Sequence, residues 1–296
     1  MQWRRHVTGC AFCFVFVLSN FTNKFVLSVL NFTYPTLFQG WQTLIGAVLL
    51  LLFAKLGWVE ISRITRSAAL SWLPASLLFV GNIYAGSKAL SRIDIPFFFT
   101  LQNSSHVVSY VMLKVVQRGK TQWLKLTSVC LMLVSAANLL YSDPQLDHSG
   151  SMWAVFHLVC VGAYRVFQVH HRSSTLSDLE QQCINYVFSV LLLAAAAHPT
   201  GDLVGVLEFP SLQSHIFHCG CAASAALGFL LLLATVKLKT GPSLEHVGIW
   251  MFFSKVTAIC LSPFIFNMDI NAASLICVVI SHAGEALLMY SERESP

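Results

Sequence analysis

Apolar residues gather in long runs along this chain, and short polar segments separate the runs. Each run approaches the roughly 20 residues that a helix needs to cross the hydrocarbon core of a bilayer. The runs cover residues 7–30, 35–56, 68–90, 95–116, 121–141, 150–169, 182–199, 211–236, 246–267 and 271–290. The pattern therefore predicts an all-α protein with ten transmembrane helices and no space for a separate extramembrane domain.

The composition supports a membrane protein and excludes several function classes. Hydrophobic residues make up 56% of the 296 residues and charged residues only 10%, whereas soluble domains carry about 25% charged residues. The mean hydropathy is +0.68. A soluble enzyme, a nucleic-acid-binding protein and a disordered chain are all poor matches. Because any chemistry must then occur within the helix bundle or at its mouths, the composition favours transport over catalysis.

The basic residues predict the orientation in the membrane. With ten spans, both termini and the even-numbered loops lie on one side, and this side carries fourteen of the eighteen Lys and Arg residues. They are Arg4, Arg5, Lys55, Arg63, Arg66, Lys114, Arg118, Lys120, Lys125, Arg165, Arg172, Lys237, Lys239 and Arg293. By the positive-inside rule, both termini are expected in the cytoplasm. The net charge of +5 is thus a topology signal and not the mark of a nucleic-acid surface.

A faint internal repeat emerges when the chain is compared with itself at an offset of 149 residues. Residues 87–90 then lie over residues 236–239, and His106 lies over Lys255. Five spans in residues 1–141 and five in 142–296 would make two halves with opposite orientations. Inverted repeats are typical of transporters, in which the substrate site lies near the midplane between the repeats.

Apart from the basic residues assigned above to the loops, Lys24, Lys88, Lys255 and the carboxylate Glu285 lie inside the apolar runs. A lysine at the bilayer centre costs about 2.5–3.5 kcal/mol, so Lys24 and Lys255 are candidate substrate-binding residues. Lys88 is close enough to the end of its run that snorkelling to the interface explains it equally well. Glu285 is the one carboxylate inside a run, and we expect it to pair with a lysine.

Several uncharged polar residues also interrupt the apolar runs. Taken singly, each can serve to join helices by hydrogen bonds. Taken together, their amides and aromatic rings, with a cation, suit a ligand that has a flat base, hydroxyl groups and negative charge. Besides Lys24 and Lys255, the predicted substrate-binding residues are Tyr84, Ser87, Asn103, His106, Asn185, Tyr186 and Ser254.

The sequence carries no arrangement typical of an enzyme or a metal site. It lacks G-x-S-x-G, H-E-x-x-H, a Walker loop and a pair of intramembrane aspartates. The nine cysteines and eleven histidines do not occur at convincing metal-ligand spacing. We therefore expect no catalytic residue, no metal and no cofactor.

Several stretches resemble a known family. Residues 22–26 (TNKFV) and 34–39 (YPTLFQ) are similar to the first two spans of nucleotide-sugar transporters in the drug/metabolite transporter superfamily. Residues 87–90 (SKAL), Ile95-Pro96 and residues 102–105 (QNSS) resemble spans three and four of GDP-mannose transporters. The resemblance extends over nearly the full length, and it implies the drug/metabolite transporter fold of two inverted five-helix repeats.

Two motifs of the GDP-mannose transporters are only partly retained. The F-Y-N-N motif, which contacts the nucleobase, is matched by residues 183–186 (CINY), so that Asn185 keeps one asparagine of the pair. The G-A-L-N-K motif, whose lysine meets the phosphates, is matched by residues 251–255 (MFFSK), where Lys255 alone survives. The resemblance thus implies a phosphate role for Lys255. A diphosphate in a low-dielectric cavity needs positive partners, and Lys24 or His106 can supply a second cation. It also favours a base other than guanine, of which uridine is the commonest in the family.

The resemblance implies a Golgi antiporter. Within the family the chain most resembles a vertebrate Golgi group associated with transport of UDP-N-acetylglucosamine, and we expect import of this sugar nucleotide in exchange for UMP. GDP-mannose or another nucleotide sugar stays open as the substrate, as does a membrane scaffold or trafficking factor that transports nothing. The expected partners are the nucleotide sugar, a nucleoside monophosphate and membrane lipid, without nucleic acid, and a homodimer is one of the alternatives left open.

Overall fold

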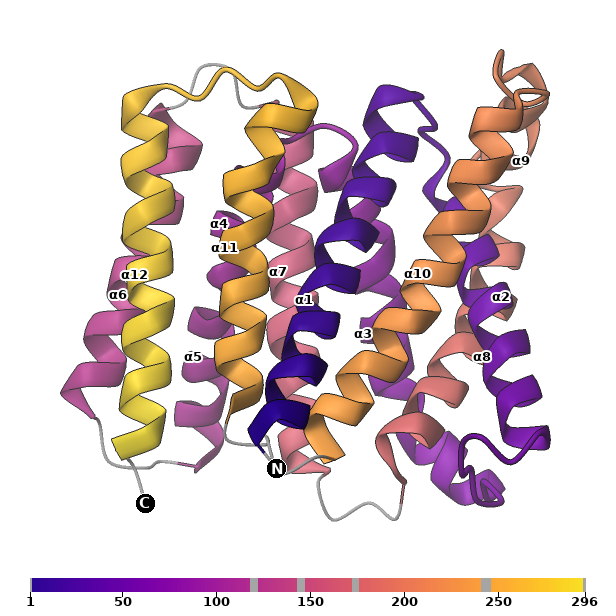
Figure 1. Cartoon of the computed structure of the whole chain (residues 1–296), viewed down its shortest axis with the longest axis horizontal. Coiled ribbons are helices and arrows are strands. Elements are labelled where there is room, and N and C mark those ends of the chain that lie inside the picture. Colours follow the sequence, from indigo (N-terminus) through magenta and orange to yellow (C-terminus); the bar gives the residue numbers. More distant parts are fainter. Residues whose placement is uncertain (1, 118–121, 143–146, 172–175, 241–245, 295–296) are drawn as a thin grey trace.

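The computed structural model describes residues 2–117, 122–142, 147–171, 176–240 and 246–294 (Figure 1). These residues form helices and connecting loops, and no strand occurs among them. The first half contains α1 (Gln2–Lys24), the π-helical turn η1 (Phe25–Val29), α2 (Pro35–Lys55), α3 (Arg66–Leu90), α4 (Ile95–Asn103), α5 (Ser105–Gln117) and α6 (Trp123–Ser142). The second half contains α7 (His148–His170), α8 (Asp178–Ala197), α9 (Asp202–Gly205), the 3₁₀ turn η2 (Val206–Glu208), α10 (His215–Thr240), α11 (Val247–Phe266) and α12 (Ala272–Glu294).

Nine helical segments in the described part of the chain are long and apolar enough to cross a membrane. They are α1 with η1, α2, α3, α6, α7, α8, α10, α11 and α12. Many large apolar side chains of these helices are exposed, for example Phe14 and Phe264, as expected where lipid replaces water. The prediction of an all-helical, multi-pass membrane protein is confirmed.

The predicted fourth span, residues 95–116, differs from a single continuous helix. Ser104 separates α4 from α5, and neither helix alone is long enough to span a bilayer. The Ser104 amide donates to the carbonyl of Leu101, and its hydroxyl donates to the Met132 carbonyl of α6. The Asn103 side chain also bonds outside its own helix, to Ser281 of α12 and Lys255 of α11, so the break lies where contacts with other helices hold the side chains.

The long helices lie side by side and cross the bundle in alternating directions (Figure 1). The described N- and C-terminal helices begin and end at the same end of the bundle, here called the terminal end (Figure 1). Helix α3 packs against α7, α2 against α8, α6 against α12, and α1 against α10 and α11. Arg118, Lys120 and Arg172, which contribute to the charge bias, lie outside the described residues.

Local sequence signals explain where several helices begin. Pro35 occupies the first turn of α2, where its missing N–H costs nothing. Ser177 and Glu180 form a reciprocal capping box at the start of α8, and the Asp147 carboxylate caps α7. The capping box at the start of α8 lies beside the terminal-end cavity described below, whereas the starts of α2 and α7 lie at the opposite end of the bundle (Figure 1).

An aromatic cluster packs the opposite end of the bundle. Phe32, in the loop after η1, lies with its ring centroid 4.8 Å from that of Phe217 on α10 and 5.2 Å from that of Phe209 after η2. Tyr34 contacts Phe32 at 5.3 Å. Beside the cluster, Thr36 donates to the Asp202 carboxylate from its backbone N–H at 3.0 Å and from its hydroxyl at 2.5 Å. The cluster therefore joins the two halves of the chain.

Replacing Phe32 by alanine should strongly destabilise the protein. Phe32 is 4% exposed, whereas Phe14 on α1 is 68% exposed. A buried Phe→Ala change costs about 3–5 kcal/mol, so Phe32→Ala should lower the melting temperature of the detergent-purified protein by several degrees. Phe14→Ala is the matched control and should change it little. Equal shifts for both variants would contradict this packing.

Candidate functional site

The centre of the candidate site is the ammonium group of Lys255 on α11. Its Nζ donates to Glu285 Oε1 of α12 at 2.5 Å and to Asn103 Oδ1 of α4 at 2.9 Å. Lys255 is 9% exposed, Glu285 5% and Asn103 0%. The expected pairing of Glu285 with a lysine is confirmed. Three helices thus converge on one buried cation.

Further polar groups extend this cluster on both sides. The Asn103 amide donates to Ser281 Oγ at 3.4 Å, and Ser281 donates to the Thr100 carbonyl at 3.4 Å. The second carboxylate oxygen of Glu285 is buried and has no hydrogen-bond partner among the described residues. A buried, unpartnered oxygen costs free energy. A bound ligand or a local movement can therefore change the hydrogen bonds of this carboxylate.

The break between α4 and α5 sends two predicted residues in different directions. Asn103, the last residue of α4, bonds Lys255, whereas His106 of α5 faces α7, where Arg165 Nη1 lies 3.2 Å from His106 Nδ1. From the sequence, Arg165 was predicted only to contribute to the charge bias between the two sides of the membrane. Its position inside the 150–169 apolar run was the signal that could have identified it, because an arginine there is expensive without a purpose.

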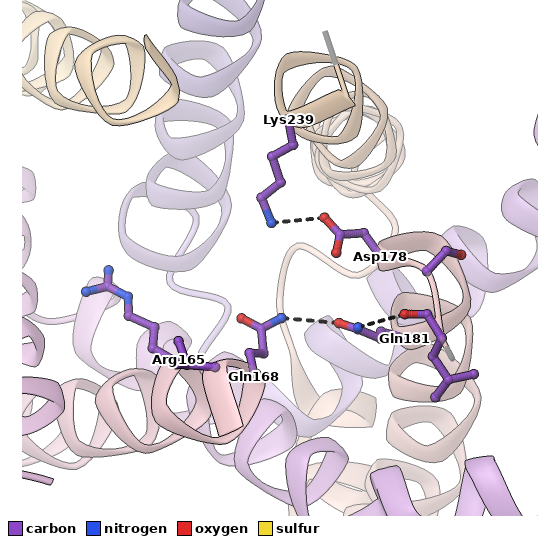
Figure 2. Close-up of a pocket in the computed structure, with 8 residues that line it drawn as sticks. Arg165, Gln168, Asp178, Gln181 and Lys239 are labelled. Atoms are coloured by element: carbon purple, nitrogen blue, oxygen red, sulfur yellow. Dashed lines mark hydrogen bonds and ion pairs between the residues drawn. The ribbon is translucent and has the colours of Figure 1, made fainter. Parts of the chain in front are cut away.

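A cavity of about 460 Å³ opens between α7, α8 and α10 (Figure 2). It lies towards the terminal end, where α7 and α10 end and α8 begins (Figure 1). Its lining residues are Arg165, Gln168, Val169, Leu176, Ser177, Asp178, Gln181 and Lys239. Neither Asp178 nor Lys239 was predicted as a site residue, because both lie just outside predicted spans, where charges are ordinary.

Two pairs of side chains bridge the cavity walls (Figure 2). Lys239 Nζ lies 3.2 Å from Asp178 Oδ2, and the Gln168 amide donates to Gln181 Oε1 at 3.4 Å. Arg165 extends away from both pairs in this view (Figure 2). The cavity therefore combines two amides, the Lys239–Asp178 ion pair and the Arg165 cation, which can bind the polar groups of a ligand.

Asn185 of α8 lies in a separate hydrogen-bond network. Its Oδ1 accepts from Trp72 Nε1 at 3.1 Å and from Ser76 Oγ at 2.9 Å, and its Nδ2 donates to the Tyr164 hydroxyl at 2.9 Å. These bonds join α3, α7 and α8. They give Asn185 a helix-joining role, and its predicted contact with a substrate would require some of them to be exchanged.

Tyr186 and Ser254 are also buried. Tyr186 packs with Ala47, Leu50 and Phe229 and lies directly against Gly46 of α2, where a Cβ atom would fall 2.8 Å from its ring. Ser254 precedes Lys255 but donates to the Trp250 carbonyl of its own helix at 2.6 Å. Their predicted role in substrate binding stays a prediction.

The remaining predicted residues lie in other contacts. Lys24 donates to the Leu90 and Ile93 carbonyls at 3.0 and 2.8 Å and lies 3.6 Å from Asp94. Ser87 accepts a bond from Gln39 at 2.5 Å, and Tyr84 packs edge-to-face with Trp153. The structure thus joins Lys255 directly to Asn103 and distributes the other predicted residues over separate clusters.

Curated relatives match the chain over its full length. It is 51% identical to the UDP-N-acetylglucosamine transporter TMEM241 homolog of Xenopus laevis, over 99% of both chains. It is 48% identical to the UDP-N-acetylglucosamine transporter TMEM241 of Mus musculus, over 100% of this chain and 99% of that one. The chain belongs to the TMEM241 family. Its full-length relatives are transporters and not enzymes, in agreement with the lack of a catalytic motif.

More distant comparisons agree with this family. GDP-mannose transporter 2 of Neosartorya fischeri is 30% identical over 136 residues, which are 46% of this chain and 38% of that protein. No family model matches the chain. A solved crystal structure with 13% sequence identity superimposes over 99% of both chains with a TM-score of 0.61, so this TMEM241-family member shares its fold with a known protein.

A double-mutant cycle should measure the Lys255–Glu285 pair. Removing either partner leaves a buried, uncompensated charge and should destabilise the protein by about 3–5 kcal/mol. Lys255→Ala combined with Glu285→Ala should therefore cost less than the sum of the two single changes, with a coupling of about 1–3 kcal/mol from thermal or denaturant unfolding.

The Lys239–Asp178 pair is the matched control for this cycle. Its side chains are 39% and 44% exposed, and exposed pairs contribute only about 0.2–1 kcal/mol. A coupling for Lys255 and Glu285 no larger than that of this control would contradict a buried, mutually neutralising pair.

Proposed function

We propose that the chain carries UDP-N-acetylglucosamine into the Golgi lumen in exchange for UMP, by alternating access and with both termini in the cytoplasm. The observation that carries the proposal is the near-full-length relationship, at 51% and 48% identity, to two proteins named as transporters of this nucleotide sugar. The multi-pass bundle and its buried cation agree with such a cargo.

Lys255 is the proposed ligand of the substrate phosphates. A diphosphate that enters a low-dielectric bundle needs a positive partner, since an unpaired charge there is expensive. Glu285 neutralises Lys255 in the described structure. We expect phosphate oxygens to replace the Glu285 oxygen on Nζ, so that the cation is paired both with and without substrate.

The helix contacts support two inverted repeats, residues 1–141 and 142–296. In this arrangement the helices of the two halves correspond in chain order: α1 to α7, α2 to α8, α3 to α10, α4–α5 to α11, and α6 to α12. The contact of α3 with α7 then corresponds to that of α10 with α1, and the contact of α3 with α8 to that of α10 with α2. Helices α2 and α8, like α6 and α12, contact their own equivalents.

The same correspondence favours a central position for Lys255. Its hydrogen bond to Asn103 joins α11 to α4, which are equivalent elements of the two proposed repeats. A contact between equivalent elements lies near the axis that relates the halves, where inverted-repeat transporters bind their substrates. The two ends of the bundle also differ, with the cavity at the terminal end and the aromatic cluster of Phe32, Phe209 and Phe217 at the other. This difference supports a conformation that accepts substrate from the terminal end.

Uptake by proteoliposomes tests the proposal. Vesicles that contain the purified protein and internal UMP should accumulate labelled UDP-N-acetylglucosamine, and vesicles without UMP should accumulate much less. Lys255→Gln should reduce the initial rate at least about tenfold, because loss of a buried charge partner costs more than the 1.4 kcal/mol that a factor of ten represents.

The control for this experiment is Lys55→Gln, which removes an exposed lysine at the end of α2. It should leave the rate within about twofold, as surface substitutions usually do. Normal uptake by Lys255→Gln would remove the assignment of Lys255. Uptake of GDP-mannose instead would show that GDP-mannose is the substrate. If the wild-type protein takes up no nucleotide sugar, the proposed function is contradicted.

A further inference from the structure

We propose that the cavity between α7, α8 and α10 is the entrance for the substrate, and that Arg165 is the residue that first binds its phosphates. This inference rests on the proposed function and adds a second phosphate-binding residue to it. The ligand class is a nucleoside diphosphate that carries a sugar.

The charges of Lys239, Arg165 and Lys255 differ in how they are neutralised. Lys239, at the cavity wall, is paired with Asp178, and Lys255, deeper in the bundle, is paired with Glu285. Arg165 has no carboxylate within ion-pair distance in the described part of the chain, and its guanidinium bonds to His106. An anion that enters from the terminal end therefore meets in Arg165 a cation that needs no counter-ion to be displaced.

Arg165 connects the cavity with the buried cluster. Its side chain lines the cavity, and its Nη1 lies 3.2 Å from His106, three residues beyond the Asn103 that binds Lys255. In Figure 2 the guanidinium extends away from the Lys239–Asp178 and Gln168–Gln181 pairs. The Glu285 and Glu292 carboxylates favour the positive charge of Arg165 from beyond ion-pair distance. Along the chain, only three residues therefore separate the contact of Arg165 from that of Lys255, on the two sides of the α4–α5 break.

The chemistry of the cavity suits a phosphate group with a sugar. A guanidinium presents five N–H donors in a planar fork that matches phosphate oxygens, and the bond to His106 leaves most of these donors available. Gln168 and Gln181 supply amides that can bind hydroxyl groups. The cavity of about 460 Å³ lies within the range of about 300–1,000 Å³ that small-molecule sites occupy.

Binding measurements on the purified full-length protein test the role of Arg165. Isothermal titration with UDP, UMP and uridine separates the phosphate contribution from that of the base. Arg165→Gln should weaken UDP binding at least about tenfold, as expected for loss of a charge-assisted contact, and should change uridine binding less than about twofold. Arg165→Lys keeps the charge but loses the fork, so its affinity for UDP should lie between those of the wild type and Arg165→Gln.

Arg92→Gln is the matched control. It removes the same charge at an exposed position where Arg92 pairs with Asp147, outside the cavity, and should leave UDP binding within about twofold of the wild type. UDP affinity for Arg165→Gln within this same range would overturn the proposal, and so would equal losses for UDP and uridine. If Arg165→Gln does not fold, Arg165→Lys decides, since wild-type affinity for UDP would then contradict a bidentate contact.

The failure of this inference differs from the failure of the proposed function. If the wild-type protein binds UDP and Arg165→Gln binds it equally well, the function stands and the entrance is elsewhere. If the wild-type protein binds none of the uridine nucleotides, both the function and the role of Arg165 in uridine-nucleotide transport are contradicted.

Discussion

A positive charge inside a bundle of apolar helices needs a partner, and the arrangement around Lys255 satisfies this requirement. Its ammonium group, on α11, donates hydrogen bonds to Glu285 of α12 and Asn103 of α4. Asn103 is the last residue of α4, before the chain turns at Ser104, so the interruption of the predicted fourth span and the position of the cation belong to one structural feature. Because a buried pair of this kind costs desolvation energy and contributes little net stability, we regard its function as the reason for its presence.

The other charges form a consistent route around this pair. The cavity at the terminal end carries Lys239 with Asp178, followed inward by Arg165 with His106 and then by Lys255 with Glu285. At the opposite end, Lys24 binds backbone carbonyls after α3, and the aromatic side chains around Phe32 fill the space between the halves. In the proposed transporter, the cations at the terminal end are positioned to bind the substrate phosphates, while side chains pack the opposite end of the bundle. In alternating access, the terminal end would close and the opposite end would open.

The sequence predicted the helical class, the positions of most spans and the pairing of Glu285, because these depend on the length of apolar runs and on the cost of isolated charge. It did not predict the division of residues 95–116, since the effect of Ser104 depends on its bond to Met132 in another helix. Nor could it separate Asn185, which binds Trp72, Ser76 and Tyr164, from Asn103, which binds Lys255. Both are asparagines in apolar runs, and only the rotation of each helix in the packed bundle decides which partner it meets. Arg165 was not predicted as a site residue for a different reason, because its position near a span end is explained equally well by topology.

The most direct test of the central claim is an experimental structure of the protein with UDP-N-acetylglucosamine bound. The account predicts a phosphate oxygen within hydrogen-bond distance of Lys255 Nζ, with the Glu285 carboxylate displaced from the 2.5 Å contact that it makes here. A bound nucleotide sugar whose phosphates lie elsewhere, while Lys255 and Glu285 remain paired, would contradict it.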